Sequence, residues 1–426
     1  MIKENQKPMI KGLIITVLSL MLLITLPFIT SLISERENFQ EEVTSEVTSK
    51  WGKNQTIFGP FVLVEYNTTF AGENGAIMKQ KHSYLQAPII QEFTGGIKSQ
   101  IKKRSLYEVT LYNTNLKVKA SFPTLEELAV KLNLPDKESF SSAKIIFSVS
   151  DNKGFTQEIF INKNPKQFFE KDMNLKENPS FTYLSYDITN ENFDLKDVTF
   201  PIQLKGSTEL NFLATAKQTN VDIKSDYKDI KYIGNYLPET EEKKTIDESS
   251  KWTIYQSIPV HSNLETISQL SEYSFGMKFI QLNDFYSKVN RATKYALLFI
   301  GLTFATFFFM ENLKNLSINI LHYALVGLAL CINFILLLSF AEYVGFTYAY
   351  LISSMATILL ISSFIYSLSK DKRITITILV LLFILYAFLF FLLQLKEAAL
   401  IVGSVGLFAI IALLMHFSRR INFVTK

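Results

Sequence analysis

The sequence predicts a membrane protein with three parts: an N-terminal transmembrane anchor, a large β-rich (α+β) extracytoplasmic domain, and a C-terminal block of five transmembrane helices. Three observations predict it: an uncharged run over Gly12–Ile33, a long alternating segment after it, and a dense apolar block from about residue 294. Of 426 residues, 48% are hydrophobic and only 19% are charged, against about 25% charged in soluble domains. Apolar runs near or above about 18 residues exclude a wholly soluble protein.

The first apolar run is predicted to be an uncleaved anchor over residues 12–33, preceded by a cytoplasmic tail over residues 1–11. The run exceeds the ~7–15 apolar residues of a secretory signal peptide. No Ala-x-Ala cleavage pattern follows it, and Ser34, Glu35 and Arg36 come next. Pro27 lies inside the run, and a membrane helix tolerates a kink there.

Charged residues divide the C-terminal block, residues 294–418, into five apolar segments. The first is only 16 residues, about 24 Å at the helical rise, so Lys294 must snorkel or the bilayer must thin locally. The predicted spans are residues 295–310, 318–340, 346–368, 374–394 and 398–417, followed by a cytoplasmic tail over residues 419–426.

Lys and Arg concentrate on one side of these spans, and short cytoplasmic loops collect such residues. With six spans, both termini share that side with Lys314, Lys370, Lys372 and Arg373. We therefore expect a membrane protein with both termini in the cytoplasm and residues 34–293 on the extracytoplasmic side. The formal net charge is +7 outside residues 13–293 and −3 within them. The excess positive charge therefore follows the membrane topology and gives no indication of nucleic-acid binding.

The segment 34–293 alternates polar and apolar residues over many short runs, as half-buried strands do. It could be one domain or two subdomains, separated by the charged stretch 239–250. The turn signal at 151–154 between two β-like runs predicts a hairpin of residues 143–150 and 155–161. Other predicted strands are 56–66, 106–122, 198–219 (with a turn at 205–207) and 251–260, and predicted helices are 35–50, 124–132 and 264–273.

Catalytic and metal-binding patterns are lacking, so we expect no enzyme activity, no cofactor and no metal. The glycine-rich, Walker, zinc-protease and nucleophile-elbow motifs are all absent. The four histidines, His82, His261, His322 and His416, have no partner at ligand spacing, and Cys331 is the only cysteine. Residues 151–154 resemble the start of a cation loop but lack its later acidic ligands, which favours a plain turn.

The most suggestive charges flank the second predicted span. Lys288, Arg291, Lys294 and Tyr295 precede it and Glu311 ends it. Residues 288, 291 and 295 would share one face of a helix. They could contact a lipid phosphate or a carboxylate, or they could simply anchor the helix at the interface, as Lys, Arg and Tyr commonly do. No charge lies deep inside a span, which argues against an ion-coupled transporter.

Over nearly its whole length, the chain resembles the CreD family of inner-membrane cell envelope integrity proteins. The run Asn290–Leu313 is very similar to that family's most characteristic stretch. One departure is Asn235-Tyr236, where the family more often has an acidic residue and Phe. Further matches are 58–60, 106–122, 233–238, 322–323, 325–328, 336–340, 342 and 345–347.

The resemblance implies a role in envelope integrity and stress response, without catalytic residues; Arg291, Lys294, Tyr295 and Glu311 are family-signature candidates. We expect a periplasmic domain that binds an envelope component or a partner protein, with membrane lipids as the other partner. The alternatives are a transporter or lipid-handling protein that uses the five-helix block, and an enzyme with a site built from scattered residues. The ligand and the oligomeric state stay open.

Overall fold

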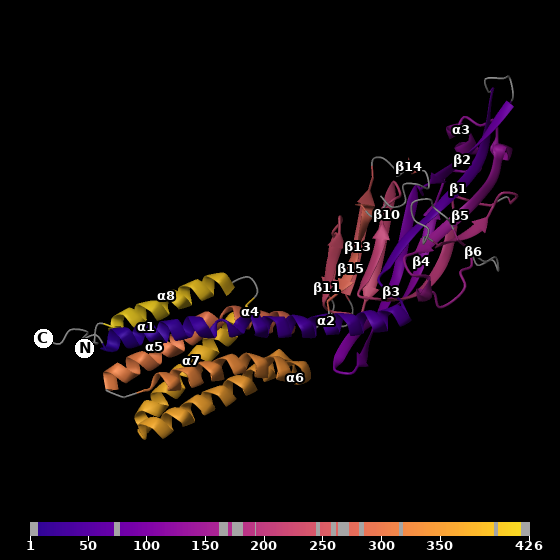
Figure 1. The fold of residues 1–426 in the computed structure, drawn as a ribbon. Helices are drawn as coiled ribbons and strands as arrows, with labels where there is room; N and C mark the ends of the chain where they lie inside the picture. Colours follow the sequence, from indigo (N-terminus) through magenta and orange to yellow (C-terminus); the bar gives the residue numbers. More distant parts are fainter. Residues whose placement is uncertain are drawn as a thin grey trace. The chain divides into compact units, whose positions relative to one another are not determined.

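The computed structural model describes residues 7–71, 77–161, 169–172, 182–191, 193–243, 248–256, 261–262, 272–280, 285–314, 318–395 and 399–418. The chain divides into two compact units. One unit is helical and comprises Met1–Glu41 with Asn283–Lys426, and the other is β-rich and comprises Glu42–Leu282. The predicted order of an apolar N-terminal helix, a β-rich middle domain and C-terminal helices is confirmed (Figure 1).

The N-terminal apolar run forms two consecutive helices, α1 (Lys7–Leu22) and α2 (Thr25–Trp51). The break between them has a physical cause, since Pro27 has no N–H to donate to the carbonyl of Leu23. Tight turns replace the missing bond, with Ile24 N donating to Met21 O (3.1 Å) and Leu26 N donating to Leu23 O (3.1 Å). The predicted anchor over residues 12–33 therefore falls on α1 and the start of α2, with a break in the helix at residues 23–24.

The C-terminal block consists of α4 (Phe285–Lys294), α5 (Ala296–Lys314), α6 (Ile320–Ser369), α7 (Lys372–Gln394) and α8 (Ala399–Ser418). Helix α4 differs from the rest because its polar residues lie on one face, while Phe285, Tyr286 and Val289 are buried on the other. It meets α5 at a bend of 47°. The predicted spans 295–310, 374–394 and 398–417 fall mainly on α5, α7 and α8, and the predicted spans 318–340 and 346–368 both fall mainly on α6.

Helix α6 is a hairpin of two antiparallel arms, residues 320–344 and 346–369. Gly345, at the break, has a non-helical backbone (φ 76°, ψ 167°). Thr357 Oγ1 donates to Asn333 Oδ1 (3.1 Å), and the rings of His322 and Phe364 lie 5.5 Å apart. In one straight helix, residues 24 and 42 positions apart would be separated by about 36 Å and about 63 Å. The chain therefore reverses at Gly345, between the predicted spans 318–340 and 346–368.

Within the described residues, three helices are long and apolar enough to cross a membrane: Ile10–Trp51, Ile320–Ser369 and Lys372–Gln394. A fourth is reached if the bent pair α4–α5 counts as one span. Because Ile320–Ser369 is a hairpin, it could supply two crossings. The six-span count and the side on which each loop lies remain predictions.

The β-rich unit is a sandwich of two sheets (Figure 1). Sheet A has the order β11-β15-β9-β1-β5-β7-β6, with β2 on β1 and β14 on β2, and sheet B has the order β12-β13-β10-β3-β4-β8. Sheet A contains β1 (Gln55–Ala71), β2 (Ile77–Gln86), β5 (Phe140–Val149), β6 (Phe169–Asp172), β7 (Thr182–Asp187), β9 (Glu209–Leu213), β11 (Ile230–Gly234), β14 (His261–Ser262) and β15 (Ser274–Phe279). Sheet B contains β3 (Ile90–Arg104), β4 (Tyr107–Ser121), β8 (Val198–Ser207), β10 (Gln218–Ser225), β12 (Thr240–Lys243) and β13 (Glu248–Tyr255).

Alternating apolar residues of both sheets form one core between them, as the period of the sequence predicts. Phe93 of sheet B packs on Phe212 of sheet A, with ring centroids 5.0 Å apart, and Phe200 of sheet B packs on Phe147 of sheet A at 5.3 Å. Trp252 is fully enclosed in the same cluster. The chain changes sheets after β8, at Thr208 (φ 56°), close to the turn predicted at 205–207.

Two sequence-based predictions in this unit are wrong. Residues 155–161 are not the second strand of a hairpin. The Asp151 side chain instead caps a short 3₁₀ turn (Asn152–Gly154), and Phe155 makes a single bridge to Leu204 of sheet B. The stretch 239–250 is not a linker, since it contains β12 and the start of β13, which pair at the edge of sheet B. The helix predicted at 264–273 lies almost wholly outside the described residues, and Glu272 and Tyr273 form a short 3₁₀ turn. The helix predicted at 124–132 is α3 (Leu125–Lys131), with a capping box at Thr124.

Gly345→Ala should destabilise the helical unit because a Cβ is strained at φ 76°, although no atom lies within 4 Å of its position. The expected cost is about 1–3 kcal/mol. Gly301→Ala is the matched control, since its Cβ also meets nothing within 4 Å but its backbone is helical. That change should be neutral or stabilising by about 0.5–1 kcal/mol. Unfolding of the purified full-length protein in detergent measures both, and equal effects would contradict the hairpin geometry.

Candidate functional site

The outer face of sheet B carries a polar hollow of about 730 Å³. Strand register builds its floor: Gln203 of β8 is opposite Asn115 of β4, Asn115 is opposite Gly96 of β3, and Gly96 is opposite Lys224 of β10. These residues alternate with buried core residues, so they face away from the sandwich core. Gly96 supplies no side chain in the middle of this row, and a Cβ there would meet only Lys224 O, at 3.7 Å.

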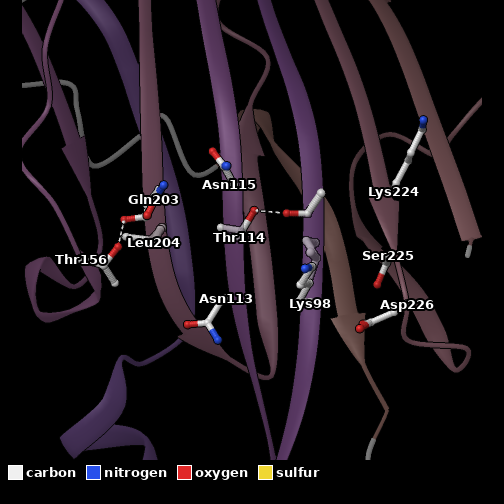
Figure 2. Close-up of a pocket in the computed structure, with 12 residues that line it drawn as sticks. Lys98, Asn113, Thr114, Asn115, Thr156, Gln203, Leu204, Lys224, Ser225 and Asp226 are labelled. Atoms are coloured by element: carbon white, nitrogen blue, oxygen red, sulfur yellow. Dashed lines mark hydrogen bonds between the residues drawn. The ribbon is translucent and has the colours of Figure 1, made fainter.

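Amide, hydroxyl and ammonium groups line the hollow (Figure 2). Asp226 is already engaged, since one carboxylate oxygen accepts the backbone N–H of Ser99 at 2.7 Å. Lys98 and Lys224 are exposed, and neither takes part in an ion pair with a described residue. Thr114 Oγ1 donates to Gly96 O (3.1 Å) and holds the adjacent strands together. The hollow therefore offers hydrogen-bonding groups and a local excess of positive charge.

The C-terminal end of α2 packs on the same sheet. The ring of Trp51 lies between two ammonium groups, Lys102 Nζ at 4.0 Å and Lys205 Nζ at 4.4 Å from the ring centroid. Glu46, one turn earlier, pairs with Lys50 (2.6 Å) and Arg104 (3.5 Å). The hydrogen bond from Lys50, and then the charges of Lys50 and Arg104, lower the pKa of the Glu46 carboxyl below its ordinary value. Cation–π contacts and ion pairs thus fix this helix end on sheet B.

Of the predicted signature residues, Arg291 has the clearest role. Its guanidinium donates to the carbonyls of Leu393 (3.0 Å) and Leu395 (3.3 Å). Those carbonyls lie at the C-terminal end of α7, where a helix leaves four carbonyls without intrahelical partners. Arg291 therefore caps α7. A neighbouring cation, Lys288, lies over the Phe346 ring at 5.6 Å.

Lys294 and Tyr295 lie at the bend between α4 and α5. Lys294 is exposed, as an interfacial anchor would be, and Tyr295 is half-buried. Tyr295 N donates to Ala292 O (3.1 Å), so a tight turn closes the bend.

Glu311 is buried at the other end of α5 and forms an ion pair with Lys11 of α1. Its carboxylate also accepts the Tyr323 hydroxyl (2.9 Å) and the backbone N–H of Ile318 (3.1 Å). The Lys11 ammonium donates to the carbonyl of Ile318 as well. One carboxylate therefore joins α1, α5 and the start of α6.

The predicted candidates therefore form two groups. Arg291, Lys294 and Tyr295 lie in α4 and at the bend before α5, and Glu311 lies near the other end of α5, about 24 Å from Tyr295 at the helical rise. The sequence analysis missed the polar hollow, although the residues of β4 carry a signal for it: Asn113 and Asn115 alternate with buried residues of the same strand. Among the described residues, no group of three His, Cys, Asp or Glu side chains could hold a metal ion.

Comparisons with known proteins find one matching family model and a similar protein of the same description. A family model described as "Inner membrane protein CreD" matches residues 7–424. The protein named Inner membrane protein CreD from Escherichia coli (strain K12) is 24% identical over 421 residues, which cover 95% of this chain and 91% of that protein. The resemblance inferred from residues 290–313 and their neighbours is confirmed.

Glu311→Gln should destabilise the helical unit because it leaves the Lys11 ammonium without its counter-ion. Breaking a buried pair costs up to about 3–5 kcal/mol. Adding Lys11→Met should recover part of the loss, since the carbonyl of the introduced amide still accepts from Tyr323 and Ile318. A double-mutant cycle on thermal unfolding in detergent measures this coupling, and strictly additive losses would contradict it. Lys50→Gln, in an exposed pair, is the control and should change little.

Proposed function

The chain belongs to the CreD family of inner membrane proteins, and from this premise we propose that it is a non-enzymatic contributor to cell envelope integrity or the stress response. In this proposal, the β-rich unit lies in the periplasm and binds an envelope component or a partner protein. The helical unit anchors it, with both chain termini in the cytoplasm.

Loop charge supports this topology. Lys370 lies in the short turn between α6 and α7, Lys372 and Arg373 begin α7, and all three are exposed. Short loops rich in Lys and Arg stay on the cytoplasmic side. An even number of spans then puts both ends of the chain on that side, and the β-rich unit on the other.

The polar hollow on sheet B is the observation that carries the binding proposal. An ordinary solvated sheet face is covered by its own side chains, whereas Gly96 leaves the centre of this face open. Asn113, Asn115 and Gln203 offer both donors and acceptors around it. Lys98 and Lys224 add positive charge, which favours a polar ligand that bears negative groups.

Filling the hollow should impair the cellular role while leaving the fold intact. Gly96→Gln places a side chain over the floor, where the nearest atom to a Cβ is Lys224 O at an ordinary contact distance of 3.7 Å. In a deletion strain that is sensitive to detergents and envelope-directed agents, the wild-type gene should restore growth and this variant should not. Lys119→Gln, on the same face but outside the hollow, is the control and should restore growth.

A deletion strain with unchanged detergent sensitivity would contradict the envelope role. Full complementation by Gly96→Gln, at equal protein abundance, would contradict the use of the hollow.

Single-cysteine labelling tests the topology directly. Cys331 is the only native cysteine and is buried, so background labelling should be low. In cells whose outer membrane has been permeabilised, a membrane-impermeant maleimide should label Lys119→Cys. It should label Lys370→Cys only after the inner membrane is disrupted. The reverse pattern would overturn the proposed orientation.

A further inference from the structure

An apolar groove of about 420 Å³ runs along the seam between the two arms of α6. Its lining includes the small side chains of Ala329 on one arm and Ala356 on the other, and longer apolar side chains such as Ile332 and Leu360. Ile332 is 51% exposed and Leu360 is 60% exposed. In an inner membrane protein, apolar side chains so exposed face lipid.

The length of the groove fits a single leaflet. Its lining on the first arm extends from Leu325 to Leu336, about 16 Å at a rise of about 1.5 Å per residue. That is about half of the ~30 Å hydrocarbon thickness of a bilayer. One acyl chain entering from one leaflet would therefore occupy the groove from end to end.

Polar groups gather at one end of the groove. His322 lies one helical turn before Leu325, and its ring packs against Phe364, which lines the groove. The Nδ1 atom of His322 is buried and has no hydrogen-bond partner among the described residues. A buried polar atom without a partner indicates a missing ligand or water.

Positive charge lies at the same end. Because the arms are antiparallel, the pairing of His322 with Phe364 puts the turn after Ser369 level with the start of the first arm. Lys370 in this turn, and Lys372 and Arg373 at the start of α7, are exposed. No ion pair joins them to a described residue. Asp371 is engaged as the N-cap of α7, where it accepts the Arg373 N–H (2.8 Å).

We propose that this groove is a specific site for one phospholipid with an anionic headgroup. Its acyl chain lies between the arms of α6, and its phosphate faces His322 and the basic turn. Each Lys or Arg near an anionic lipid surface contributes about 1 kcal/mol, so the turn selects headgroup charge while the groove holds the chain. The site lies wholly within the helical unit and is independent of the hollow on sheet B.

Native mass spectrometry of the purified full-length protein tests the site. After delipidation, the protein is titrated with phosphatidylglycerol or with phosphatidylcholine of the same acyl chains. We expect one high-occupancy phosphatidylglycerol molecule, bound about tenfold or more tightly than phosphatidylcholine. Equal binding of the two lipids would overturn the headgroup assignment.

Two sets of variants separate the groove from the turn. Ala329→Trp fills the groove and should abolish the high-occupancy lipid, while Leu351→Trp, exposed on α6 outside the groove, should not. Lys370→Asn combined with Lys372→Gln and Arg373→Gln should reduce the preference for phosphatidylglycerol about tenfold or more and keep the chain bound. Asn is chosen at position 370 because it tolerates the left-handed backbone there (φ 54°). Wild-type lipid occupancy in Ala329→Trp would overturn the groove assignment.

Photocrosslinking of the unmodified protein tests the site without relying on the folding of a variant. Phosphatidylglycerol with a photoreactive group in its acyl chain should crosslink to peptides covering residues 325–336 and 356–364. Crosslinks spread evenly over α7 and the exposed face of α6 would overturn the site.

Discussion

The helical unit is organised by a constraint on backbone hydrogen bonds, because hydrocarbon offers no partner to an N–H or a carbonyl at a helix end. Side chains meet this requirement at several of the described helix ends. Asn319 caps the start of α6, Asp371 caps the start of α7, and Arg291 closes the end of α7. Glu311 accepts the N–H of Ile318 while it pairs with Lys11. The charged residues of this unit that stand out in the sequence therefore act on chain ends and junctions, with no pathway for ions implied.

In the β-rich unit, the strands of the two sheets satisfy one another's backbone groups, and a buried amide does so where the two sheets meet. Gln55 of sheet A is fully buried, and its Nε2 donates to the carbonyls of Asp151 and Lys205, both at 3.1 Å. Lys205 lies in β8 of sheet B, opposite Asn113, which lines the hollow. A Cβ on Gly154 would meet the same Lys205 carbonyl at 2.5 Å, so only glycine fits at this junction. Gln55 of sheet A thus holds β8 of sheet B next to the hollow.

The sequence was sufficient for the features that depend on local composition. Apolar runs coincide with the positions of α5, α7 and α8 within a few residues, and period-two alternation located β1, β4, β8 and β13. It failed where non-local contacts decide the outcome. Residues 155–161 have the composition of a strand, yet the bridge from Phe155 to Leu204 draws the chain to the edge of sheet B. Residues 239–250 have the composition of a linker, yet residues 240–243 pair with residues 248–251 of β13 and form the edge of sheet B.

The contrast between local composition and non-local contacts also explains which parts of the candidate site could be predicted. Arg291 and Glu311 stand out in a chain with few charges near its spans, so they could be identified from the sequence, but their partners lie 102 and 300 positions away. The hollow depends on four strands brought into register, and none of its residues is unusual alone. Gly96 becomes informative only when Asn115 and Lys224 are known to be its neighbours.

The short parallel pairing of Gln55–Ile57 with Leu210–Phe212 has a consequence for biogenesis. Strand β1 lies in the interior of sheet A, yet one of its neighbours is synthesised about 150 residues later. Closing so long a loop is slow, and the strand edge stays unpaired until then. The β-rich unit must therefore complete its folding after nearly the whole segment has emerged, and it must do so without any disulfide to hold an intermediate, since it contains no cysteine.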